Sequence, residues 1–235
     1  MKRHLWFAVN SLLVLVALLM LWHVGVVELK VPPYILPGPW AVAKAVVNRF
    51  PALAQSLWLT TEAAALGLVC SIAGGVVVAL LFAQWRWLRR LFFPYTILLQ
   101  TVPIVAIAPL IIMWAGSGVY SVAIITFIIC LPPVIANTTQ GLISVDRNLI
   151  DLFLMHKATR AQVLFKLRLP HALPNLFVGV RISAGIAVVG AIIGELFASS
   201  SRVGVGGLGY SITYAYSQLE IDYLFALVVA ATVPL

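Results

Sequence analysis

The sequence predicts an all-α polytopic membrane protein with about six transmembrane helices. Three observations support this fold class: 63% of the 235 residues are hydrophobic, only 9% are charged, and the apolar residues form long runs. A soluble domain carries about 25% charged residues, and a helix needs roughly 20 residues to cross a bilayer. The runs are too long and continuous for the strands of a membrane barrel, so helices remain as the way to satisfy the backbone in lipid.

We expect six spans within a single transmembrane domain that covers residues 1–235. They lie near residues 5–27, 57–83, 91–114, 118–137, 174–198 and 221 to the end. The first begins with Lys2 and Arg3 and is too long for a signal-peptide core, so it should be a retained helix. The last has the length of only about 20 Å, short of the ~30 Å hydrocarbon core, which predicts a truncated helix.

The net charge of +8 is explained by membrane orientation. With a cytoplasmic N-terminus, ten basic residues fall in inner segments and four in outer ones, the first of which is residues 28–55. The inner set is Lys2, Arg3, Arg86, Arg89, Arg90, Arg147, Lys157, Arg160, Lys166 and Arg168, and the outer set is Lys30, Lys44, Arg49 and Arg202. This excess follows the positive-inside rule. It excludes a nucleic-acid partner and predicts a multi-pass protein of the bilayer.

Two spans carry small residues at every fourth position, which allows neighbouring helices to approach closely when lipid offers no hydrophobic drive. The second span has Ala63, Gly67, Ser71, Gly75 and Ala79, and the fifth has Gly179, Ser183, Ala187 and Ala191 beside Gly190, Gly194 and Ala198. We expect these two spans to form the tightly packed centre.

Prolines and acids within the spans are candidates for a pathway or gate. Pro103 and Pro109 bend the third span, either as structural kinks or as part of a solute path. Glu62 and Glu195 are the acids nearest the membrane interior, where an ionisable group is by default a functional hypothesis. Glu195 shares the register of the Gly179–Ala191 stripe and should face protein. The alternative is that both acids are hydrated at helix ends.

Other sequence patterns argue against nucleotide and metal sites in this chain. Residues 204–209 read GVGGLG, but no strand precedes them, so a loop or the start of a helix is the better interpretation than a dinucleotide site. No GxxxxGK[ST] sequence occurs, and the four histidines and two cysteines lack metal-ligand spacing. The sequence therefore argues against a dinucleotide site, a P-loop and a metal site in this chain.

A charged segment, Asp151–Pro174, interrupts the apolar sequence. Ser144 or Asp146 should cap one short helix, and Thr159 should cap a second that ends at Pro170. Two amphipathic helices within residues 146–168 favour a protein-docking element. The alternative is a solvated loop on anionic headgroups.

The chain resembles the transmembrane permease subunits of bacterial ABC importers, in the group for nitrate, sulfonates, taurine and vitamin precursors. The runs LPGPWAV, PIVAIAPLIIMWAGSG, NTTQGLISVD, LRLPHALPNLFVGVRIS and GLGY carry this resemblance along nearly the whole chain. The cytoplasmic signature of such permeases is EAA, three residues, Gly, nine residues, then I-x-L-P. Asp151 takes its Glu place, Leu152 and Phe153 replace its alanines, Lys157 replaces its glycine, and Leu167, Leu169 and Pro170 take the I-x-L-P.

The resemblance implies a type I importer permease fold with a cytoplasmic coupling helix, in the bacterial inner membrane. It also implies a second permease copy, a cytoplasmic ATPase dimer that docks on the coupling region, including Arg160, and an outer solute-binding protein. ATP and Mg would be bound by the ATPase, so the permease is not an enzyme. The expected solute is a small oxyanion (nitrate, a sulfonate or taurine). The alternative solute for the same importer class is a pyrimidine or flavin vitamin precursor. The alternative functions are a secondary transporter and a membrane scaffold.

Overall fold

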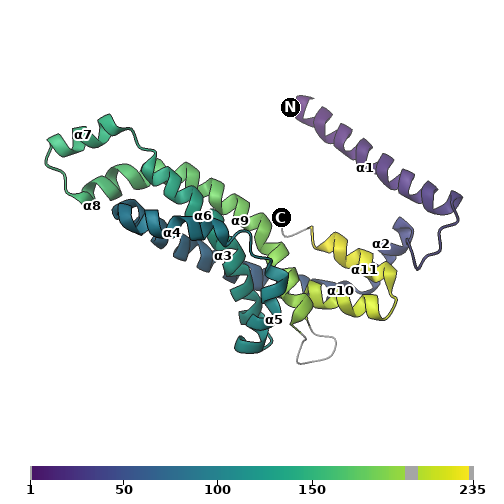
Figure 1. The fold of residues 1–235 in the computed structure, drawn as a ribbon. Helices are drawn as coiled ribbons and strands as arrows, with labels where there is room; N and C mark the ends of the chain where they lie inside the picture. Colours follow the sequence, from purple (N-terminus) through teal and green to yellow (C-terminus); the bar gives the residue numbers. More distant parts are fainter. Residues whose placement is uncertain (1, 199–205, 233–235) are drawn as a thin grey trace. The chain divides into compact units, whose positions relative to one another are not determined.

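The computed structural model describes residues 2–198 and 206–232, and its regular structure over these ranges is helical (Figure 1). The chain divides into two compact units. The first contains the described residues within 1–57 and 211–233, and the second contains those within 58–210. The boundaries fall inside α3 (Phe50–Gln84) and α10 (Leu208–Ser217), so each of these helices contributes to both units.

The first unit contains α1 (Lys2–Glu28), α2 (Pro39–Asn48) and α11 (Ile221–Ala230). Pro39 occupies the first turn of α2, because a proline there loses no helical hydrogen bond. The α2 helix packs on α11, and it buries Val42 and Ala45.

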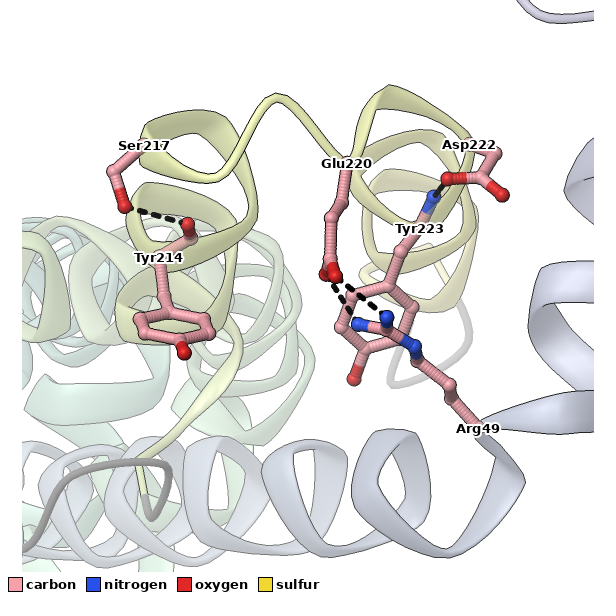
Figure 2. A network of polar contacts seen from close by, with 6 residues as sticks. All are labelled: Arg49, Tyr214, Ser217, Glu220, Asp222 and Tyr223. Carbon is pink, nitrogen blue, oxygen red and sulfur yellow. Dashed lines mark hydrogen bonds and ion pairs between the residues drawn. The ribbon is translucent and has the colours of Figure 1, made fainter.

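An ion pair fixes the end of α2 to the start of α11 (Figure 2). The guanidinium of Arg49 donates from Nη2 to Glu220 Oε1 at 2.6 Å and from Nη1 to Glu220 Oε2. The same group lies 4.8 Å from the centroid of the Tyr223 ring, a cation–π contact. These hydrogen bonds from Arg49 lower the pKa of the Glu220 carboxyl and raise the pKa of the Arg49 guanidinium. Both groups therefore stay charged at neutral pH.

The second unit is built around α6 (Val119–Ile143), which makes its largest contact with α9 (Leu169–Phe197). Every residue of the predicted small-residue stripes in α3 and α9 is buried. A Cβ added to Gly67 would lie 2.5 Å from Thr126 Cβ, and one added to Gly75 would lie 2.6 Å from Val134 Cγ1, so α3 approaches α6 closely. On α9, Gly179 faces Pro133 and Val134 of α6.

The stripes of the second and fifth spans therefore both press against the fourth span. The two spans expected to form the tightly packed centre share a third helix, α6, on which both pack. Ala63 and Ala64 of α3 share a buried cluster with Ala187 and Ala191 of α9, so the two outer helices also meet. Small side chains on both partners let α6 pack tightly on two sides.

The predicted third span, residues 91–114, is not one helix. The chain forms α4 (Arg86–Leu98) and α5 (Ile104–Ala115), and Pro103 caps the start of α5 with extended backbone. Proline lacks the N–H that a continuous helix requires and disfavours helical backbone at the residue before it. Pro109, in contrast, is accommodated inside α5.

Four described helices are long and apolar enough to span a membrane, in the ranges Asn10–Glu28, Phe50–Gln84, Val119–Ile143 and Arg160–Phe197. Two shorter apolar helices, Ile104–Ala115 and Ile221–Ala230, lie in the regions of the other two predicted spans. The fold is thus an all-α polytopic membrane protein.

Candidate functional site

A helical hairpin, α7 (Arg147–Met155) and α8 (Arg160–Val163), lies at one end of the second unit (Figure 1). Asp146 caps α7, since its Oδ1 accepts from the Asn148 N–H at 2.9 Å. Thr159 and Gln162 form a reciprocal capping box at the start of α8, with bonds of 3.3 and 2.7 Å. The two caps predicted from Asp146 and Thr159 are confirmed.

The turn between these helices is centred on Lys157, which has a left-handed φ of 54°. Its N–H donates to Leu154 O at 2.9 Å, and the Ala158 N–H donates to Phe153 O at 3.0 Å. This pair of bonds is a Schellman motif, in which glycine is strongly preferred at the left-handed position. Lys157 occupies the glycine place of the permease signature, so the structure gives the physical reason for a glycine there.

The prediction that the second hairpin helix ends at Pro170 is wrong. A π-helical turn, η1 (Leu164–Arg168), joins α8 to α9 without a break, and the Leu169 N–H donates to Leu164 O, five residues back. Pro170 then sits in the first turn of α9. The wider π turn accommodates a proline that would clash with the carbonyl four residues earlier in an α-helix.

The two faces of α7 have different surroundings. Leu149 and Leu152 are 44% and 48% exposed, and Leu154 and Met155 at the end of α7 are more exposed, at 55% and 81%. Arg147 and Asp151, about half a turn away on the other face, line a cavity with Arg168. The other predicted coupling residues differ in exposure. Arg160 lines a neighbouring cavity with Leu154, and Pro170 is exposed. The half-buried ones are Phe153, Leu167 and Leu169.

A second polar group is buried at the start of α10. Glu195, only 6% exposed, accepts a hydrogen bond from Thr60 Oγ1 at 2.9 Å and another from the Gly209 N–H at 2.9 Å. Thr60 Oγ1 in turn accepts from the Leu208 N–H at 2.7 Å. Glu195 therefore faces protein, as its register predicted, and the alternative of a hydrated helix end is wrong for this residue. Helices α3 and α9 together supply the acceptors for the first N–H groups of α10.

Glycines make this arrangement possible. A Cβ on Gly207 would overlap the Glu195 carboxylate, and a Cβ on Gly209 would lie 2.8 Å from Glu195 Cβ. The described part of the GVGGLG run, residues 206–209, is thus the start of a helix that approaches an acid, while residues 204 and 205 lie outside the described ranges. The glycines serve close packing around a carboxylate.

The other pathway candidates are not part of the Glu195 group. Glu62, Pro103 and Pro109 are exposed. Arg181, an exposed residue near the middle of α9, was not among the predicted site residues. The signal was present: a single arginine between Val180 and Ile182 in a long apolar helix. Within residues 2–198 and 206–232, no cluster of three or more His, Cys, Asp or Glu side chains is placed to bind a metal.

The chain combines long apolar helices with a capped helical hairpin that follows the span Val119–Ile143. A family model described as "Binding-protein-dependent transport system inner membrane component" matches residues 71–235. The chain belongs to this family, which comprises the inner-membrane permease subunits of ABC importers. The predicted membership and type I permease fold are confirmed.

Curated relatives in this family have names that refer to different solutes. The chain is 36% identical over 214 residues to the riboflavin transport system permease protein RibX of Chloroflexus aurantiacus, which covers 88% of this chain and 78% of the relative. It is 30% identical over 231 residues to the formylaminopyrimidine transport permease protein ThiX of Halalkalibacterium halodurans, with 96% and 88% covered. It is 31% identical over 235 residues to the putative aliphatic sulfonates transport permease protein SsuC of Bacillus subtilis, with 96% and 80% covered.

Membership of this family defines the general function of the chain. It is a membrane-embedded transport subunit of a binding-protein-dependent ABC system, and such a system also contains an ATPase and a solute-binding protein.

Proposed function

We propose that the α7–α8 hairpin docks a cytoplasmic ATPase dimer and that the chain forms part of a solute pathway. The observation that carries the docking proposal is the exposed apolar face of α7 with Leu149 and Leu152. This face follows the end of the span Val119–Ile143, so lipid tails do not explain its exposure. An amphipathic helix with such a face is typical of helix-in-groove recognition. The permease family supports an ATPase as the partner.

Arg181 supports a second permease copy as the other part of the pathway. Its side chain is exposed in the single chain although it lies near the middle of the long apolar helix α9. An arginine that faced lipid at this depth would cost about 2.5–3.5 kcal/mol or more. We infer that this face of α9 meets protein or a water-filled path, and a second copy supplies both.

Coupling is proposed to run along one helix. The segment from Arg160 to Phe197 is helical throughout, with the hairpin turn at one end and Glu195 near the other. Movement of an ATPase at the hairpin would shift α9 and, through Glu195, the start of α10. Alternating access then requires two arrangements of this unit, which ATP binding and solute delivery bias from opposite sides of the membrane.

The orientation follows the positive-inside bias, with the N-terminus and the hairpin in the cytoplasm. ATP and Mg are bound by the ATPase, so this chain contributes no catalytic residue. A solute-binding protein delivers the solute from outside.

For the solute we propose a small oxyanion of the sulfonate type. Arg181 would place a positive charge on the pathway, and similarity to a sulfonate permease supports this class. The second candidate is a pyrimidine or flavin vitamin precursor, favoured by the similarity to ThiX and RibX.

The docking proposal is tested with Leu152→Asp in proteoliposomes that contain the permease, its ATPase and its binding protein. We expect copurification of the ATPase and ATP-dependent uptake to fall at least about tenfold, because a charge would enter an apolar interface. The control is Leu152→Met, which keeps an apolar side chain of similar volume at the same position and should retain the ATPase. Equal loss in both variants, or none in either, would contradict docking on the Leu149–Leu152 face.

The same proteoliposomes distinguish the solute classes and the other functions. Labelled taurine uptake that excess sulfonate blocks and riboflavin does not would support the oxyanion, and the reverse inhibition with labelled riboflavin would support the vitamin precursor. Arg181→Gln should reduce uptake of the oxyanion much more than Arg181→Lys. Uptake driven by an ion gradient without ATP would contradict the importer mechanism and support a secondary transporter.

A further inference from the structure

A cavity rich in arginine lies where the hairpin meets the helical bundle of the second unit. Its volume is about 630 Å³, and it is lined by the end of α3, the start of α4, the segment that leads from α6 into α7, and η1. Arg86, Arg89, Arg147 and Arg168 line it together with Asp151. We call this space the arginine cavity.

The charges around the arginine cavity are not balanced. Four guanidinium groups and one carboxylate give it a formal charge of +3 (four minus one). Within the part of the chain that the structure describes, Arg49 and Glu220 form the one ion pair, so none of these four arginines is paired with an acid. Like charges that share one space without a counter-ion repel each other, which favours the binding of an anion.

Arg168 adds a specific unsatisfied donor. Its Nη1 donates to the carbonyl of Ala83 at 3.0 Å, which holds the side chain between η1 and the end of α3. Its Nε is buried and has no hydrogen-bond partner within the described part of the chain. Because this Nε is not accessible from the cavity, the donors that an anion can reach are the Nη groups of the lining arginines, whose fork is well matched to phosphate oxygens.

The position of the cavity indicates the source of the anion. Arg86 lies directly after the end of the apolar span Phe50–Gln84 and between two exposed tryptophans, Trp85 and Trp87. Tryptophan is enriched at the depth of the lipid headgroups. Basic pockets between helices at the cytoplasmic interface are typical sites for acidic phospholipid headgroups. The opposite face of α7, with Leu149 and Leu152, is the one suited to a protein partner.

We propose that the arginine cavity binds the headgroup of an anionic phospholipid, with its phosphate diester held by these guanidinium groups. The lipid phosphate would bridge α4, α7 and η1. It would thereby fix the hairpin against the bundle, and the position of the hairpin would depend on the lipid composition of the inner leaflet. The site is separate from ATPase docking, so either proposal can fail without the other.

The test measures lipid retention by native mass spectrometry of the purified full chain. The probes are phosphatidylglycerol, phosphatidylcholine and inorganic phosphate. We expect the wild type to retain phosphatidylglycerol in preference to phosphatidylcholine. The double variant Arg86→Gln/Arg89→Gln should bind phosphatidylglycerol roughly 25-fold more weakly, since each basic residue near the surface contributes a factor of about five.

The matched control is Arg90→Gln/Lys166→Gln, which removes the same charge from residues that do not line the arginine cavity. It should retain phosphatidylglycerol as the wild type does. Arg86→Lys/Arg89→Lys should recover part of the binding, and unchanged circular dichroism in all variants shows that they fold. Equal retention in the glutamine variant and the wild type would overturn the proposal. Inorganic phosphate binding as tightly as the lipid would likewise overturn a lipid site, and release of the lipid by added ATPase would overturn its separation from the docking surface.

Discussion

The first N–H groups of α10 find their hydrogen-bond acceptors in a different way from the first N–H groups of α7 and α8. At each, backbone N–H groups lack acceptors within their own helix. In the hairpin the acceptors are local: Asp146 lies two residues from Asn148, and Thr159 lies three from Gln162. At α10 they are remote, since Thr60 lies 148 residues from Leu208 and Glu195 lies 14 residues from Gly209.

The difference has consequences for stability and for coupling. The hairpin caps are exposed, so water can replace them, and each stabilises only its own helix. The acceptors at α10 are buried, and they connect three helices through one carboxylate and one hydroxyl. Loss of a remote cap should therefore disturb tertiary structure, whereas loss of a local cap should disturb one helix end.

The largest effect is expected for Glu195→Ala. It removes the acceptor of the bonds from Thr60 and Gly209 in a buried site, and such losses cost about 1–3 kcal/mol each. We expect a loss of about 3 kcal/mol, measured as a drop in the unfolding midpoint of the protein in nanodiscs, together with loss of uptake.

Two further variants sharpen this result. Glu62→Ala removes the exposed acid of α3 and should leave the midpoint nearly unchanged. Glu195→Gln keeps an acceptor oxygen and should recover part of the stability. If Glu195→Gln also keeps full uptake, the negative charge of Glu195 has no part in transport and the residue is a structural clamp.

The next effect is expected for Gly207→Ala, because its Cβ would overlap the Glu195 carboxylate. Overpacking of this kind typically costs about 1–3 kcal/mol. Gly185→Ala is the control, since a Cβ there meets no atom within 4 Å and alanine favours a helix. A lowered midpoint for Gly207→Ala, with an unchanged or raised midpoint for Gly185→Ala, is the expected pair. Equal midpoints would show that the carboxylate can move away at little cost.

The same distinction between local and remote contacts explains what the sequence could predict. Asp146 and Thr159 were predictable because a cap and the helix it serves are adjacent in the chain. The small-residue stripes were predictable because a period of four is itself visible. Their common partner α6 was not, since its contact surface contains ordinary residues such as Thr126 and Val134.

The burial of Glu195 was predictable from its register, but its partners were not. Thr60 is one of several hydroxyl residues in α3, and no local pattern connects it with Leu208. The π turn was also missed, because a proline preceded by a helix usually indicates a boundary. The continuation of the helix is visible only in the structure, where η1 runs directly into α9.

For the local caps, Thr159→Ala should have a smaller effect than either change near α10. Loss of an N-cap side chain costs about 1 kcal/mol, and here the site is exposed. We expect faster hydrogen exchange at the amides of α8, with little change in the global unfolding midpoint. Thr159→Ser keeps the acceptor and should retain most of the protection. A global drop as large as that of Glu195→Ala would break the distinction between local and remote caps.

The smallest effect, and the one of opposite sign, is expected for Lys157→Gly. Lys157 has φ of 54°, and a left-handed residue other than glycine carries a cost of roughly 1–2 kcal/mol. Glycine removes this cost but adds conformational freedom to the unfolded chain, worth about 0.5–1 kcal/mol. The net gain should be under about 1 kcal/mol, seen as slower hydrogen exchange in α7 and α8. Lys166→Gly, within the π turn, should have the opposite effect, because no left-handed strain is relieved there. If Lys157→Gly instead speeds hydrogen exchange, the Lys157 side chain stabilises the turn by more than its backbone strain costs. The hairpin would then depend on a side-chain contact in addition to the backbone hydrogen bonds of the turn.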